Sequence, residues 1–174
     1  LLYVGNVTME KGILLLLDTL GKIKNAPKTY IAGDGYLLEK SKHIVEKRKL
    51  DVQFLGRVSH YDAIDYMLSC KALVFPSVWH EPLARSLIEA SMLGVPIVAT
   101  DTGGTTDIIE DGKTGVLTRP EPSDFAKKVK LVLENKKLRE RIGSNAKRNA
   151  ARKFGEDPVT SKFERVYEEA LKKY

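Results

Sequence analysis

The sequence has little of what disulfide frameworks, metal clusters and membrane spans require. Its 174 residues include one cysteine, Cys70, which excludes an intrachain disulfide and a zinc site built on cysteines. No apolar run approaches the roughly 20 residues that a membrane-spanning helix needs. No basic segment precedes the apolar N-terminus, as one would in a secretory signal. We therefore expect a cytoplasmic protein.

Two common phosphate-binding motifs are also absent. The spacing Gly-x-Gly-x-x-Gly does not occur, and neither does Gly-x-x-x-x-Gly-Lys-Ser/Thr. Gly33-Asp34-Gly35 is a short Gly-x-Gly that is more typical of a turn than of a ligand contact. The sequence therefore carries neither the dinucleotide-binding motif nor the P-loop.

Positive charge is unevenly distributed along the chain. The net charge is +6, and residues 121–174 hold 15 basic and 9 acidic side chains, whereas residues 1–120 hold 14 of each. A basic tail is compatible with nucleic acid, with an anionic membrane surface or with solvent-exposed helical faces. Aromatic residues make up only 7% of the chain, and no nucleic-acid recognition module is present, so we expect no nucleic acid partner.

Short apolar runs alternate with amphipathic stretches over residues 1–120. The runs show little polar alternation, which is typical of strands that are covered on both faces. Strand–helix repetition predicts a doubly wound, Rossmann-like α/β domain with a parallel sheet. The expected strands are Leu1–Gly5, Thr29–Gly33, Val52–Leu55, Ala72–Pro76, Pro96–Thr100 and Gly115–Thr118. The expected helices are Gly12–Lys24, Leu37–Lys49, Tyr61–Cys70 and Leu83–Leu93, with a short turn after Gly104.

Only helices are expected after Pro120. Residues 1–174 should form one domain, with an α/β core at 1–120 and a helical C-terminal extension at 121–174. The expected helices of the extension are Asp124–Asn135 with Ser123 as N-cap, Lys137–Lys153 and Pro158–Lys173. They should pack across the sheet or onto a partner domain. Because the chain begins inside a strand, we expect it to be a piece of a longer polypeptide.

The turns after the strands carry the chemistry, because ligands of doubly wound sheets bind at the carboxyl ends of the strands. In the first turn, Gly5 removes a side chain where the backbone bends or approaches a ligand. Lys11 lies near a helix N-terminus, where a positive charge is unfavourable unless an anion is present. The turn fits a bound phosphate, although a solvent-exposed lysine explains it equally well.

The turn after the fourth expected strand contains Glu81, and the helix that follows it contains Glu89. Glu89 lies beside the apolar stripe of that helix, which is a poor place for an unpaired carboxylate. The vicinal hydroxyls of a ribose would satisfy it, and so would an ion pair with Arg85, one turn back. These residues alone leave both interpretations open.

The turns and strand ends contain a series of motifs, which are, in order, Gly5…Lys11-Gly12, Gly33-x-Gly35, Phe54-Leu55-Gly56-Arg57-Val58, Pro76-Ser77, Glu81-x7-Glu89-Ala90, Gly94-x-Pro96-Ile97-Val98-Ala99, Gly103-Gly104 and Asp111-Gly112-Lys113-Thr114-Gly115. Taken together, these motifs resemble the C-terminal domain of GT-B glycosyltransferases, and more narrowly their retaining Glu-x7-Glu group. The resemblance implies a domain that binds a nucleotide-diphosphate sugar, and it implies an acceptor-binding domain that precedes this one and is absent from the chain. The implied activity is transfer of a hexose, with mannose as the most frequent case, to a glycan or lipid-linked acceptor.

The resemblance also implies roles for individual residues. Lys11 would bind the donor diphosphate, Glu89 would hold the ribose, and Glu81 would lie next to the transferred sugar, so that Lys11 and Glu81 are the catalytic pair. The other expected substrate contacts are Gly5, Asn6 and Gly33, the backbone N–H groups of Leu83, Ala84 and Arg85, and, beside the nucleobase, Arg57 and Val58. No divalent metal is expected, because a lysine and a helix N-terminus can stabilise a leaving diphosphate. A lipid-linked acceptor would place the basic helices at the cytoplasmic face of a membrane.

Departures from the family pattern keep other functions open. The family usually has Arg at the position of Asn6, so a neighbour such as Arg57 or Arg85 would have to supply that cation. Leu83-Ala84 stands where an aromatic residue and a glycine are usual, and Asp107 stands where a Glu is common. The alternatives are a non-catalytic or divergent nucleotide-sugar-binding module and, as a minor one, a nucleotide-sugar epimerase.

Overall fold

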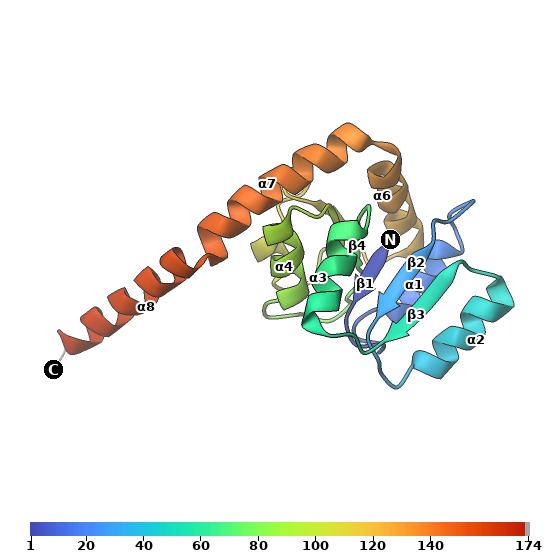
Figure 1. Cartoon of the computed structure of the whole chain (residues 1–174), viewed down its shortest axis with the longest axis horizontal. Helices are drawn as coiled ribbons and strands as arrows, with labels where there is room; N and C mark the ends of the chain where they lie inside the picture. Colours follow the sequence, from blue (N-terminus) through green and yellow to red (C-terminus); the bar gives the residue numbers. More distant parts are fainter. Residues whose placement is uncertain (173–174) are drawn as a thin grey trace.

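The protein is represented by a computed structural model, which describes residues 1–172 and contains one parallel sheet with helices on both faces (Figure 1). The strands are β1 (Leu2–Val4), β2 (Thr29–Ala32), β3 (Val52–Gly56), β4 (Leu73–Phe75), β5 (Ile97–Thr100) and β6 (Val116–Thr118). The helices are α1 (Ile13–Leu20), α2 (Leu38–Arg48), α3 (His60–Ser69), α4 (Arg85–Leu93), α5 (Thr105–Ile108), α6 (Pro122–Glu134), α7 (Lys136–Phe154) and α8 (Glu156–Leu171). The strand order is β3-β2-β1-β4-β5-β6, which confirms the predicted doubly wound fold class.

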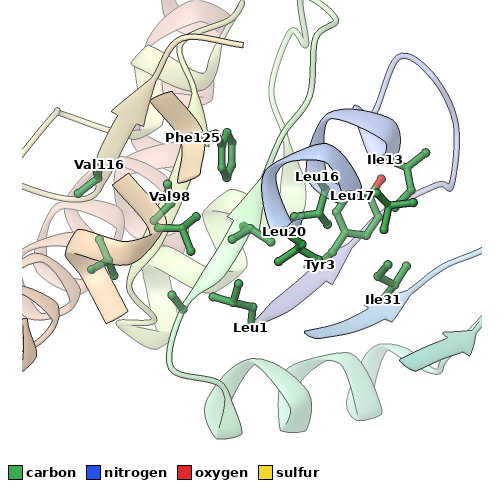
Figure 2. Close-up of a cluster of buried hydrophobic side chains, with 14 of the residues drawn as sticks. Leu1, Tyr3, Ile13, Leu16, Leu17, Leu20, Ile31, Val98, Val116 and Phe125 are labelled. Atoms are coloured by element: carbon green, nitrogen blue, oxygen red, sulfur yellow. The ribbon is translucent and has the colours of Figure 1, made fainter. Parts of the chain in front are cut away.

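Strand residues point alternately to the two faces of the sheet, and each face has its own apolar core. On β1, Tyr3 packs in a cluster with α1, α2 and α6, whereas Leu2 packs in a second cluster with α3, α4 and α5. Figure 2 shows the first cluster around Tyr3 and the leucines of α1. Because both faces are buried, the strands read as continuous apolar runs rather than as alternating ones.

The first helix is shorter than predicted. Its buried residues Ile13, Leu16, Leu17 and Leu20 follow helical spacing and face the sheet. The helix ends at Leu20 instead of Lys24, because Gly21 caps it and the backbone continues in tight turns. The helix is therefore four residues shorter at its C-terminal end than the sequence pattern indicates, although Ile23 in the following turns still packs against the same core.

The C-terminal helices differ in how they pack. Helix α6 begins at Pro122, and its N-cap is Glu121 rather than the predicted Ser123. Asp124 instead accepts a hydrogen bond from the Arg119 N–H at 2.9 Å, which ties the helix to the end of β6. Helix α7 buries Ile142 and Ala146 and packs against α4.

Helix α8 extends α7 away from the sheet (Figure 1). None of its residues from Glu156 to Leu171 is buried. Its start lies two residues before the predicted Pro158, and the predicted end at Lys173 lies outside the described residues. Of the two expected arrangements, packing on the sheet domain is therefore found for α6 and α7, whereas packing onto a partner domain stays a prediction for α8.

Candidate functional site

A cavity of about 650 Å³ lies at the carboxyl ends of β1 and β4, against the first turns of α3 and α4. The strand order reverses between these two strands, which is where ligands of doubly wound sheets bind. The lining residues are Tyr3, Val4, Gly5, Asn6, Lys11, His60, Ala63, Phe75, Glu81, Leu83, Ala84, Arg85, Ser86 and Glu89.

The loop after β1 forms one wall of this cavity with Gly5, Asn6 and Lys11. The hydroxyl of Tyr3 donates a hydrogen bond to the Asn6 carbonyl at 2.6 Å, which fixes the position of this loop. Burial raises the pKa of Tyr3 well above its usual value, and the nearby Glu81 carboxylate adds to this shift. Tyr3 therefore stays protonated as a donor, a positioning role that its apolar sequence context did not reveal.

The loop after β4 forms the opposite wall and carries Glu81. The Glu81 side chain is buried, and its carboxylate forms an ion pair with the Lys11 ammonium. Ser77 lies 3.3 Å away and donates a hydrogen bond from its hydroxyl to the same carboxylate oxygen. The Gly104 N–H donates to the Glu81 carbonyl at 2.6 Å, so the glycine pair after β5 holds this loop in place. The structure thus joins the two predicted catalytic residues directly.

Two threonines anchor the same loop from the next strand. The Thr102 hydroxyl donates a hydrogen bond to the Ser77 carbonyl at 2.9 Å, and the buried Thr100 hydroxyl contacts the same carbonyl. Sequence reasoning missed both residues. Their signal was the polar pair at the end of an otherwise apolar strand, where buried hydroxyls need an acceptor.

The first turn of α4 faces the cavity without a side-chain cap. Its N-cap is Ala84, which offers no oxygen to the free N–H groups. Among the described residues, no group accepts a hydrogen bond from the N–H of Arg85 or Ser86. These two donors and the positive end of the helix dipole therefore point to a place suited to an anion.

Glu89 lines the far end of the cavity and has a partner that the sequence did not predict. Its carboxylate lies 3.2 Å from Nε2 of His60, and the ion pair with Arg85, one of the two interpretations left open by the sequence, is not formed. His60 reaches this position because Ser59 and Asp62 form a capping box that starts α3 one residue before the predicted Tyr61. The Ser-x-x-Asp spacing was visible in the sequence and could have identified that start.

Comparisons with known proteins were consistent with this geometry. The family model described as glycosyl transferases group 1 matches residues 1–149. The chain belongs to this family. An uncharacterized glycosyltransferase of Methanocaldococcus jannaschii is 32% identical over 170 residues, which are 97% of this chain and 47% of that protein. The alpha-D-kanosaminyltransferase of Streptomyces kanamyceticus is 29% identical over 174 residues, covering 97% of this chain and 45% of that protein.

Solved structures share the fold over almost the whole chain. The Anabaena protein Alr3699/HepE, crystallised in complex with UDP, aligns with a TM-score of 0.90 at 24% identity and covers 97% of this chain and 48% of its own. A sucrose-phosphate synthase from Thermosynechococcus elongatus aligns with a TM-score of 0.90 at 22% identity, over 99% of this chain and 45% of its own. The predicted resemblance to the C-terminal domain of GT-B glycosyltransferases is thus confirmed for family and fold. The chain spans about half the length of the relatives that it matches.

Three of the predicted substrate contacts lie outside the cavity. Gly33 packs against the backbone of Gly5, which lines the cavity. The φ of Gly33 is +144°, and a Cβ at this position would lie 1.9 Å from the Gly5 carbonyl oxygen. Arg57 is exposed and lies 3.6 Å from the carboxylate of Asp34. Val58 does not belong to the lining either. The expected contacts of Arg57 and Val58 with a nucleobase stay predictions.

Residues 1–172 contain neither a cluster of metal-ligating side chains nor an apolar membrane-spanning helix. This part of the chain contains no group of three or more His, Cys, Asp or Glu side chains placed to hold a metal ion. None of its helices is long and apolar enough to cross a membrane.

Proposed function

We propose that this chain binds the nucleotide-sugar donor of a glycosyltransferase in the cavity between β1, β4 and α4. The observation that carries the proposal is the convergence of Lys11, Glu81 and Glu89 with the open first turn of α4 in one cavity. A cation and free N–H groups suit a diphosphate, and a carboxylate suits the vicinal hydroxyls of a ribose. The UDP and glucose in crystals of the Anabaena neighbour support the same ligand class.

In the proposed reaction, the donor loses a hexose to a hydroxyl of a glycan or lipid-linked acceptor. The bond between the anomeric carbon and the distal phosphate oxygen breaks, and its electron pair stays on the phosphate. Lys11 and the N-terminus of α4 stabilise that negative charge. The acceptor oxygen forms the new bond to the anomeric carbon and gives up its proton to the released diphosphate. Glu81 lies beside the sugar and stabilises positive charge at the anomeric carbon, with retention of configuration.

The acceptor is held by a second half of the protein in this proposal. The relatives are about twice as long as this chain, which supports a partner half beyond it. Helix α8 carries exposed apolar side chains at Phe163, Val166, Tyr167 and Leu171. These residues share one side of the helix at helical spacing, and such a stripe usually packs against another surface.

The ribose role of Glu89 provides the first test. Isothermal titration calorimetry with UDP, GDP and ADP should identify one diphosphate that binds, in EDTA as well as in Mg²⁺. Glu89→Ala should lower the affinity for this diphosphate by about tenfold or more, because hydrogen bonds to charged groups contribute roughly 1.5–3 kcal/mol. Glu46→Ala is the matched control, since Glu46 is exposed on α2 and outside the cavity. Equal affinity in Glu89→Ala and the parent would overturn the ribose role.

A second candidate function is a nucleotide-sugar-binding module without transfer activity. It is favoured by Asn6 and Ala84, which line the cavity where the family usually has Arg and Gly. The two functions differ in turnover. If the protein is an enzyme, a chain that carries both halves should release nucleoside diphosphate from the donor. Tight donor binding with no release of diphosphate, with or without acceptors, would favour the module.

A further inference from the structure

The acidic and basic side chains that line the cavity form two close pairs, and one arginine belongs to neither pair. Lys11 pairs with Glu81, and His60 pairs with Glu89. Arg85 also lines the cavity, and within residues 1–172 its guanidinium has no acidic partner within ion-pair distance. The cavity therefore contains a cation whose counter-charge is not supplied by the described part of the protein.

The place of Arg85 in the fold is unfavourable for a cation without a ligand. Arg85 is the first residue of α4, where the positive end of the helix dipole repels positive charge. Its own N–H and that of Ser86 point to the same region without acceptors. A bound anion with several oxygen atoms would both neutralise the positive charge of Arg85 and accept hydrogen bonds from these N–H groups.

We propose that the Arg85 guanidinium is the second cation that holds the diphosphate of the donor, together with Lys11. This inference rests on the proposed function and assigns one more residue to the same site. A planar guanidinium can donate two parallel hydrogen bonds to phosphate oxygens, which the single ammonium of Lys11 cannot do. When the sugar leaves, Arg85 helps to stabilise the charge on the released diphosphate.

The structure also discriminates between the two arginines that could supply this charge. Arg57 and Arg85 are both exposed, but Arg57 lies beside Asp34 at 3.6 Å and is absent from the cavity lining. Arg85 lines the same cavity as Asn6 and Lys11. The charge that Asn6 lacks is therefore supplied across the cavity, from the first turn of α4.

The test compares a nucleoside diphosphate with its nucleoside, because only the former carries the groups that Arg85 should contact. The ligand is whichever of UDP, GDP and ADP binds the parent chain. Arg85→Gln should lower the affinity for the diphosphate by about tenfold or more and change the affinity for the nucleoside by less than about twofold. Arg85→Lys should recover part of the loss, and the affinity of Arg85→Gln should depend less on salt than that of the parent. Arg48→Gln is the matched control and should bind both ligands like the parent, because Arg48 is exposed on α2 and lies outside the cavity lining.

Two outcomes would overturn the inference while leaving the proposed function in place. One is an unchanged diphosphate affinity in Arg85→Gln. The other is an equal loss for the diphosphate and the nucleoside, which would mark Arg85 as a structural residue. A parent chain that binds none of the three diphosphates would instead overturn the proposed function, and with it this assignment. Thermal unfolding of each variant checks that the fold is retained.

Discussion

The Lys11 ammonium and the Glu81 carboxylate form an ion pair between loops that lie 70 positions apart in the chain. One loop follows β1 and the other follows β4, and the parallel pairing of these strands brings their carboxyl ends together. The pair neutralises Lys11 until an anion competes for it. It also gives the buried Glu81 a cation, without which the carboxylate would be costly to bury.

The pair can be tested with a double-mutant cycle. Lys11→Met should lower the free energy of unfolding by about 1–3 kcal/mol, because it leaves the Glu81 carboxylate buried with only the Ser77 hydroxyl as side-chain partner. Adding Glu81→Gln should recover part of this loss, since no charge then remains unpaired. Urea unfolding of the parent, both single variants and the double variant measures the coupling. Strictly additive losses would show that the two side chains do not interact.

Gly33 should be intolerant of any side chain. Gly33→Ala places a methyl group 1.9 Å from the Gly5 carbonyl oxygen at a φ of +144°, so the backbone that forms the cavity wall must move. We expect a loss of about 3 kcal/mol or more in unfolding free energy, together with loss of diphosphate binding. Gly112→Ala is the control, because Gly112 also has a positive φ but open space around it. Gly112→Ala should lose only about 1–2 kcal/mol of unfolding free energy and bind the diphosphate like the parent. Equal losses in the two variants would contradict this explanation.

Tyr3 should make stability fall at alkaline pH. Because burial raises the pKa of Tyr3, the folded state keeps its proton above pH 10 while the unfolded state loses it. Unfolding free energy should therefore decrease as pH rises through the usual tyrosine range near pH 10, by up to about 1.4 kcal/mol per pH unit from this group. Below that pH range, the contribution of Tyr3 to the unfolding free energy is fully present.

The Tyr3→Phe variant isolates this effect. It should be less stable than the parent by about 1 kcal/mol at pH 8, where it lacks the hydrogen bond to the Asn6 carbonyl. Its stability should then decline less steeply than that of the parent between pH 9 and 11, as followed by urea unfolding at each pH. Tyr61→Phe, at an exposed side chain, should keep the parent profile. Parallel profiles for Tyr3→Phe and the parent would show that Tyr3 does not contribute.

Helix α8 should be dispensable for folding of the sheet. Deleting residues 156–174 removes no buried side chain in the described range, so the unfolding free energy should change by less than about 1 kcal/mol and diphosphate affinity should stay the same. Deleting residues 136–174 is the contrasting case, because it removes the buried Ile142 and Ala146 and uncovers α4. That deletion should destabilise the protein severely. A large loss of stability on removing α8 alone would show that it supports the fold.

Local sequence patterns predicted the elements well where one physical signal dominated. Continuous apolar runs identified every strand, and the leucines of α1 predicted a helix on one face of the sheet. Boundaries were less certain where signals competed. Ser123 is a good N-cap residue, yet Pro122 starts α6 because its fixed φ suits a first helical position and its missing N–H costs nothing there.

The candidate site was predictable to the extent that it lies on the turns after the strands. Of the predicted contacts, Gly5, Asn6, Lys11, Glu81, Leu83, Ala84, Arg85 and Glu89 line one cavity. The partners of these residues were not predictable. Pairing of Glu89 with His60 depends on α3 lying beside α4, and local spacing favours Arg85 instead.

The sequence by itself determined the alternation of strands and helices, because apolar periodicity and turn residues act over short distances along the chain. It also determined that the net charge of +6 lies after residue 120, away from the residues of the cavity. Only the tertiary structure decided which acidic and basic side chains lie close together. The strand order set Lys11 against Glu81, the packing of α3 on α4 set His60 against Glu89, and Arg85 was left facing the cavity. Ion pairs form between groups that are close in space, and that closeness depends on how the elements pack.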